Sequence, residues 1–128
     1  EKEEFLEDKE NSSCEIQICA LVDDRIIGLA GISAVGSKDK VKHRAEFGIS
    51  IEKAYYGKGI GTALTKACIE CAKTAGYRQL ELEVVAENKN AIALYKKFGF
   101  KEIGRNPRGF CSRYTGWQEL ISMLLVLD

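Results

Sequence analysis

Hydrophobic and polar positions alternate along the middle of the chain in the pattern of half-buried strands. In residues 44–51 every second residue is apolar: Ala45, Phe47, Ile49 and Ile51. Period-two alternation predicts a strand with one buried face and one solvated face. Turn residues bound further strand-like segments at 16–22, 25–34, 79–85, 100–104 and 118–127. Asp23-Asp24 is predicted to form a tight turn between the first two of these.

A helical period follows the strand at 44–51. Counting from Ile60, apolar residues recur at helical spacing: Ala63, Leu64, Ala67, Cys68, Cys71, Ala72 and Ala75. This stripe predicts a helix packed on a sheet and ended by Gly76. Polar residues occupy its other side: Thr62, Thr65, Lys66, Glu70 and Lys73. A second, shorter helix is predicted to begin after Asn88 and to run to Phe98.

An acidic stretch near the start of the chain and a turn sequence near its end predict two further elements. Residues 1–10 hold six acids against two lysines, a net of −4, and are predicted to be the end of a surface helix that exits at 11–13. Asn106-Pro107-Arg108-Gly109 predicts a turn before the closing strand. The order of strands, helix, strand, helix and strands predicts a three-layer α/β (α+β) domain, a mixed central sheet flanked by helices.

Composition supports one globular domain covering residues 1–128. The 128 residues hold 19 Lys and Arg against 19 Asp and Glu, with 45% apolar residues. This balance argues against a disordered chain and against a general electrostatic grip on nucleic acid. No apolar run reaches the roughly 18 residues that cross a bilayer, so no membrane partner is expected. The chain begins with Glu1 and its single methionine is Met123, so we expect an N-terminally incomplete domain whose first strand and helix have been trimmed.

Five cysteines form an odd set without a disulfide-like rhythm, which favours a reducing, cytoplasmic location. Cys68 and Cys71 have CxxC spacing, but no second Cys or His pair accompanies them. A zinc site needs about four ligands, and both residues lie in the apolar helix stripe. We therefore interpret them as core residues and expect no metal.

The segment Tyr56-Gly57-Lys58-Gly59-Ile60-Gly61-Thr62 joins a predicted strand to the long helix. Glycines let a ligand approach the backbone, and a helix start offers unpaired N–H groups at the positive end of its dipole. The segment is therefore a candidate cradle for a pyrophosphate, to which Lys58 and Thr62 add a charge and a hydroxyl. An ordinary strand-to-helix turn is the alternative. The spacing does not match a Walker loop and fits a Rossmann fingerprint poorly.

Together with a later segment, this turn resembles a known family. The stretch Glu87-Asn88-Lys89-Asn90-Ala91-Ile92-Ala93-Leu94-Tyr95-Lys96-Lys97-Phe98-Gly99-Phe100 follows at the separation seen in the GNAT superfamily of acyl-CoA-dependent N-acetyltransferases. The resemblance covers roughly residues 16–127. It implies an enzyme that transfers an acetyl group from acetyl-CoA, as co-substrate, to an amine by direct attack.

The resemblance also implies roles for individual residues. The coenzyme A pyrophosphate falls to the turn residues Gly57, Lys58, Gly59, Ile60, Gly61 and Thr62. The preceding strand lends backbone hydrogen bonds to the pantetheine and acetyl carbonyl through Ile49, Ser50 and Ile51. Asn88 matches a pantetheine contact, and Tyr95 matches the general acid for the departing thiolate. Tyr56 stands where the family usually has Gln or Arg, so one phosphate contact is lost.

Two carboxylates are candidates for the base that takes a proton from the amine. Glu46 matches the base of histone acetyltransferases in the family, and alternation places it on the face of Ser50. Glu83 matches the base position of ribosomal-protein N-terminal acetyltransferases. An alkylamine has a pKa near ~10.4, so such a base is needed at neutral pH. The bland alternative for each is a partnered glutamate at the sheet surface.

Residues 89–113 hold seven basic residues against Glu102, a net of +6. This run is either a solvated face or, through Lys96 or Lys97, a contact to the ribose phosphate of the coenzyme. Tyr114 and Trp117, in the predicted loop before the last strand, are candidates for the acceptor wall. Packing without a functional role is the equal alternative.

The expected partner is thus a small-molecule or peptide amine, with a homodimer left open. The competing function is a non-catalytic GNAT-fold sensor that binds an acyl-CoA.

Overall fold

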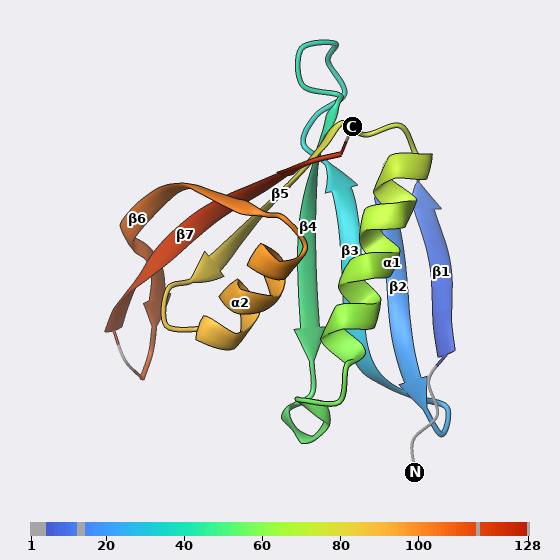
Figure 1. Ribbon diagram of the computed structural model, residues 1–128, viewed down its shortest axis with the longest axis horizontal. Helices are drawn as coiled ribbons and strands as arrows, with labels where there is room; N and C mark the ends of the chain where they lie inside the picture. The colour runs from blue at the N-terminus through green and yellow to red at the C-terminus, as the bar shows by residue number, and fades with distance from the viewer. Residues whose placement is uncertain (1–4, 13–14, 115, 128) are drawn as a thin grey trace. The chain divides into compact units, whose positions relative to one another are not determined.

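The computed structural model describes residues 5–12, 15–114 and 116–127 (Figure 1). In chain order the elements are β1 (Phe5–Ser12), β2 (Glu15–Val22), β3 (Arg25–Ala34), β4 (Arg44–Ile51), the 3-10 helix η1 (Lys53–Tyr55), α1 (Ile60–Thr74), β5 (Gln79–Val85), α2 (Lys89–Lys97), β6 (Lys101–Ser112) and β7 (Gly116–Val126). They form two compact units, Glu1–Leu80 with Leu127–Asp128 and Glu81–Val126. Each unit is described in turn.

The first unit is built on antiparallel strands in the order β1-β2-β3-β4. The predicted turn at Asp23-Asp24 joins β2 to β3 as a two-residue hairpin loop, with φ angles of 52° and 65°. Left-handed backbone at both central positions matches the right-handed twist of the flanking strands. Aspartate tolerates this region better than most residues, although glycine would adopt it without steric cost.

Helix α1 lies over one face of β2, β3 and β4 (Figure 1). Its fully buried side chains include Leu64 and Cys68, as the apolar stripe predicted. Leu64 sits above Gly28 of β3, where an added Cβ would come within 3.2 Å of its Cδ1 atom. Thr65, predicted on the polar side, is instead fully buried, and its hydroxyl has no hydrogen-bond partner among the described residues.

The predicted N-terminal helix is wrong. Residues 5–12 form strand β1, which pairs antiparallel with β2 from Phe5 opposite Leu21 to Ser12 opposite Glu15. The glutamates and lysines of this stretch are good helix formers, but propensity is a weak prior that tertiary pairing overrides. Pairing with β1 satisfies backbone groups of β2 that an edge strand leaves open. Residues 1–4 of the predicted helix lie outside the described residues.

The second unit contains helix α2 and strands in the order β5-β7-β6. Strand β5 alternates buried Leu82 and Val84 with exposed Glu83, as its sequence predicted. Strands β6 and β7 form a long antiparallel hairpin. The Ala86 N–H donates to the Glu119 carbonyl at 2.8 Å, which ties the end of β5 to β7.

The predicted turn at Asn106–Gly109 is also wrong. Strand β6 continues through these residues, and its pairing with β7 shifts register between Asn106 and Phe110. The stretch is therefore a bulge in an edge strand, a place that accepts proline because no ladder N–H is needed there. Strand β7 consequently begins at Gly116, so Trp117 lies within it rather than in a preceding loop.

Two further sequence interpretations concern membranes and cysteines. Among the described residues, no helix is both long and apolar enough to span a membrane. Cys19 and Cys68 are buried and Cys71 is half-buried, so the core interpretation of the CxxC pair is confirmed for Cys68. Within the same residues, no group of three or more His, Cys, Asp or Glu is placed to hold a metal ion.

Candidate functional site

The glycine-rich turn forms the start of α1 in the first unit. Gly57 and Gly59 have φ angles of 76° and 84°, and Gly59 is the N-cap residue of the helix. The first helical hydrogen bond runs from the Ala63 N–H to the Gly59 carbonyl at 3.1 Å. The amides of residues 60–62 precede it and point out of the helix start. A Cβ at either glycine would meet no described atom within 4 Å, so the turn has open space beside it.

Strand β4 leads into this turn and has one solvated face. Glu46 and Ser50 are both exposed on it, while Phe47 between them is buried. The structure therefore confirms that Glu46 shares a face with Ser50. Ile49 and Ile51 are half-buried at the end of the strand that precedes η1.

In the second unit Asn88 caps helix α2. Its Oδ1 atom accepts a hydrogen bond from the Ala91 N–H at 3.3 Å, as the Asn-Lys-Asn sequence at the helix start predicted. Asn88 is exposed, and the cap uses its Oδ1 atom rather than its amide nitrogen. Glu83 is exposed five residues earlier on β5.

Tyr95 lies on the buried side of α2. The residue is 6% exposed, and its ring packs against Phe100 with ring centroids 5.8 Å apart. The Phe100 N–H donates to the Tyr95 carbonyl at 3.1 Å, which fixes the backbone after the helix. Burial raises the pKa of the Tyr95 phenol above its ordinary value of 10.0, so the group is protonated at neutral pH.

The predicted site residues thus form two sets. Glu46, Ile49–Ile51 and the turn at 57–62 lie together in the first unit, at the end of β4 and the start of α1. Glu83, Asn88, Tyr95 and Lys97 belong to the second unit, on β5 and α2. The first set offers backbone amides and the Glu46 carboxylate, and the second offers the Glu83 carboxylate, an amide and a phenol.

Comparison with known sequences decides what this pairing of motifs represents. The model of the acetyltransferase (GNAT) family matches residues 1–100 of the chain. The chain belongs to this family.

Individual GNAT relatives match over most of the chain. L-amino acid N-acetyltransferase AaaT of Escherichia coli is 33% identical over 93 residues, which are 72% of this chain and 57% of that protein. N-alpha-acetyltransferase RimI of Mycobacterium tuberculosis is 32% identical over 83 residues, 65% of this chain and 50% of that protein. The chain therefore spans less than two thirds of the length of the curated relatives it matches.

Solved GNAT structures confirm the predicted fold class, an α/β sheet flanked by helices. The acetyltransferase of GNAT family from Streptococcus pneumoniae superposes with a TM-score of 0.84 at 30% identity. The match covers 91% of this chain and 69% of that chain.

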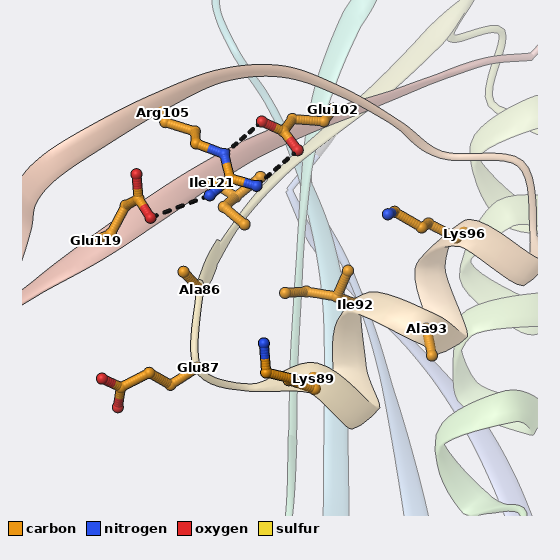
Figure 2. Close-up of a pocket in the computed structure, with 10 residues that line it drawn as sticks. All are labelled: Ala86, Glu87, Lys89, Ile92, Ala93, Lys96, Glu102, Arg105, Glu119 and Ile121. Atoms are coloured by element: carbon orange, nitrogen blue, oxygen red, sulfur yellow. Dashed lines mark hydrogen bonds and ion pairs between the residues drawn. The ribbon is translucent and has the colours of Figure 1, made fainter.

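The second unit of this GNAT chain also contains a crevice of about 550 Å³ between α2 and the β6–β7 hairpin (Figure 2). Its apolar lining includes Ile92 and Ile121. Arg105 spans its upper side, donating to both carboxylate oxygens of Glu102 at 2.6 and 3.1 Å and to Glu119 at 3.1 Å. These hydrogen bonds hold the pKa of Glu102 below its ordinary value. The cations of the crevice are therefore balanced by its own carboxylates.

The two lysines predicted as candidates for a ribose phosphate contact differ in their relation to this crevice. Lys96 lines the crevice, and Figure 2 shows its ammonium on the side where Glu102 lies. Lys96 also lowers the pKa of Glu102 through its charge. Lys97 is exposed and is not a lining residue, so it stays the candidate for the phosphate contact.

The tip of the β6–β7 hairpin carries an exposed aromatic group. Trp117 is 58% exposed and Tyr114 is 86% exposed. The Arg108 guanidinium stacks over the Trp117 ring at 5.4 Å from the ring centroid, a cation–π contact that the sequence analysis missed. This contact was not predictable from the sequence pattern, because Arg108 was expected in a turn before the last strand. In the structure it lies in the bulge of β6, opposite β7. The acceptor role of these aromatics stays a prediction.

Proposed function

We propose that this GNAT chain is an acetyl-CoA-dependent N-acetyltransferase domain that acts on a primary amine. The observation that carries the proposal is the glycine turn, where Gly57 and Gly59 hold positive φ angles with open space beside them at the start of α1. Backbone amides at a helix start suit a pyrophosphate. Lys58 and Thr62 add a charge and a hydroxyl to the same turn. Family membership supports assigning that pyrophosphate to coenzyme A.

Strand β4 is proposed to orient the thioester. Backbone groups of Ile49, Ser50 and Ile51 hydrogen-bond the pantetheine and polarise the acetyl carbonyl. Asn88 contacts the pantetheine through its amide nitrogen, because its Oδ1 atom is already engaged in capping α2. Lys97 contributes charge to the ribose phosphate. Fixed donors of this kind act without reorganising during the reaction.

The chemical step is proposed to be direct attack without a covalent enzyme intermediate. The neutral amine nitrogen attacks the thioester carbon, and the carbon–sulfur bond breaks as the tetrahedral intermediate collapses. A carboxylate takes the proton of the amine through water, and the Tyr95 phenol gives a proton to the departing thiolate. The products are an N-acetyl amide and free coenzyme A. Tyr95 can carry the proton for this role because a phenol is protonated at neutral pH.

Of the two candidate bases we favour Glu83. Relatives named for L-amino acids and for N-alpha-acetylation support an α-amine as the acceptor, and Glu83 matches the base position of the N-terminal acetyltransferases. Glu46, exposed beside Ser50, is the alternative. Glu83→Gln should lower kcat strongly, whereas Glu46→Gln should leave kcat close to the wild-type value. The reverse result assigns the base to Glu46.

The decisive experiment measures coenzyme A release from acetyl-CoA with a panel of amines. The panel contains L-amino acids, peptides with free N-termini, the same peptides with blocked N-termini, and a diamine. Thiol release with free but not blocked α-amines supports the proposal. Coenzyme binding without turnover on any amine supports the acyl-CoA sensor instead, and absence of coenzyme binding contradicts both. Sedimentation of the same sample tests the homodimer.

A further inference from the structure

An ion pair joins the start of β3 to the residue that follows β4, just before the glycine turn. Arg25, the first residue of β3, donates through Nη1 to Oε2 of Glu52 at 2.8 Å. Glu52 is the residue between the end of β4 and η1. The hydrogen bond to Glu52 and the negative charge of that carboxylate raise the pKa of Arg25. The guanidinium therefore links the start of β3 to the residue at which the chain enters η1.

Backbone hydrogen bonds make Glu52 the fixed point of this segment. Its N–H donates to the Ile27 carbonyl of β3 at 2.9 Å, and its carbonyl accepts from the Tyr55 N–H at 2.9 Å. The Tyr56 N–H then donates to the Lys53 carbonyl at 3.1 Å, and Gly57 follows directly. The path of the chain into the turn is thus set by the position of Glu52.

The segment has little else to hold it in place. Residues 53–55 are all described, and none of them is buried. Tyr56 is 60% exposed. Apolar packing therefore does not fix the approach to the turn, and polar links to β3 do. Ordering a loop on binding costs affinity, so a turn that is ordered beforehand binds its ligand more tightly.

We propose that Arg25 and Glu52 form a clamp that positions the glycine turn for the coenzyme pyrophosphate. Arg25 is a positioning residue, because it acts through Glu52 and the segment 53–56. The clamp rests on the proposed function, since it presupposes that the turn binds coenzyme A. It leaves the amine site and the proton transfers of the second unit untouched.

The experiment combines a double-mutant cycle with a matched control. Arg25→Met and Glu52→Gln are made singly and together, and coenzyme A binding is measured by calorimetry. We expect each single change to raise the coenzyme Kd about fivefold, the upper end for an exposed pair, and the double change to raise it no further. The KM for acetyl-CoA should follow, while kcat and the KM for the amine stay constant. Arg25→Lys should restore most of the affinity.

The control is the ion pair of Lys42 and Asp39. Its atoms lie 3.2 Å apart, and both residues are exposed within one loop, so the pair links no two strands. Lys42→Met should leave the coenzyme Kd unchanged. Amide hydrogen exchange at residues 57–62, measured without ligand, should be faster in Arg25→Met than in Lys42→Met. This readout tests the clamp independently of activity.

The outcomes separate the two proposals. If the wild-type chain fails to bind coenzyme A, the proposed function is wrong. If it binds and Arg25→Met binds equally well, the clamp is wrong. Additive effects in the double variant, or an equal loss of affinity in Lys42→Met, also overturn the clamp, because they show independent or nonspecific effects of charge.

Discussion

The two units are proposed to support the reaction with different chemical groups, backbone amides in one and side chains in the other. In the first unit the candidate site is backbone: positive φ angles at Gly57 and Gly59 and the amides at the start of α1. In the second unit it is side chains: the buried phenol of Tyr95 and the capping amide of Asn88. We therefore propose that the first unit chiefly binds the coenzyme phosphates, while the second supplies the phenol that gives a proton to the thiolate.

This difference teaches where substitutions should matter. In the first unit a change that alters the backbone conformation of the turn should damage binding most, whereas a change of an exposed side chain away from the turn and from the Arg25–Glu52 pair should have little effect. In the second unit single atoms of side chains should matter even when the fold is intact.

The largest effect is expected from Tyr95→Phe. Loss of the phenol removes the proton donor for the thiolate, and kcat should fall by about 10²-fold or more. The coenzyme Kd should stay within about twofold, since the turn lies in the other unit. Stopped-flow thiol release and calorimetry measure the two quantities. Tyr77→Phe is the control, and a wild-type kcat in Tyr95→Phe would contradict the side-chain role of the second unit.

A glycine change tests the first unit. Gly59→Ala forces an alanine into left-handed backbone at φ 84°, and we expect about tenfold weaker coenzyme binding. Gly76→Ala is matched: its φ is 95°, and a Cβ there also meets no described atom within 4 Å. Both variants should lose similar stability to urea, but only Gly59→Ala should lose affinity. Equal affinity losses would show that strain alone is responsible.

Two substitutions of Asn88 test the roles of its Oδ1 atom and its amide nitrogen separately. Asn88→Ala removes the cap and should lower the free energy of unfolding by about 1 kcal/mol. Asn88→Asp keeps the oxygen acceptor and should retain stability, but it loses the amide donor proposed to contact pantetheine. Both variants should therefore raise the KM for acetyl-CoA by a similar factor. If Asn88→Asp has a normal KM, the residue is a cap only.

The pH dependence of stability should report the burial of Tyr95. Its folded pKa is raised above the ordinary 10.0, so the unfolded chain releases the proton first as the pH rises. The contribution of Tyr95 to the free energy of unfolding should be constant below about pH 10 and fall above it, toward the raised folded pKa. Urea titrations of wild type and Tyr95→Phe isolate this contribution. Parallel curves for the two proteins would contradict it.

The smallest effect is a gain. Thr65→Val replaces a fully buried hydroxyl that lacks a partner among the described residues with a methyl group of the same shape. We expect the free energy of unfolding to rise by about 1 kcal/mol without change in coenzyme affinity. Thr62→Val at the half-buried turn position should instead weaken binding. Destabilisation by Thr65→Val would indicate that the hydroxyl is satisfied by water.

Much of the fold could be predicted because period and turn residues agreed locally. The predicted bounds of β3, β4 and β5 match the structure, and α1 begins at Ile60 as predicted. The failures have one cause, which is partners that lie elsewhere in the chain. Residues 5–12 become a strand because β2 offers an edge, and residues 106–109 become a bulge because β7 runs opposite them.

In the candidate site, too, local contacts could be predicted and contacts between distant residues could not. The cap made by Asn88 is three residues from its partner amide and could be predicted from sequence. Arg25 and Glu52 are 27 residues apart, and Arg105 and Glu119 are 14 apart. Nothing in a single sequence states that such charges meet, because their contact depends on strand register.

The bulge at Pro107 has a consequence for how copies of the chain behave toward one another. Strand β6 is the outer strand of its unit and exposes the large apolar side chains of Ile103 and Phe110. A flat strand with such residues would be a template on which another chain could add. The proline, the register shift and the basic residues Lys101, Arg105 and Arg108 interrupt that template. The bulge of β6, which was predicted as a turn, should therefore hinder edge-to-edge aggregation.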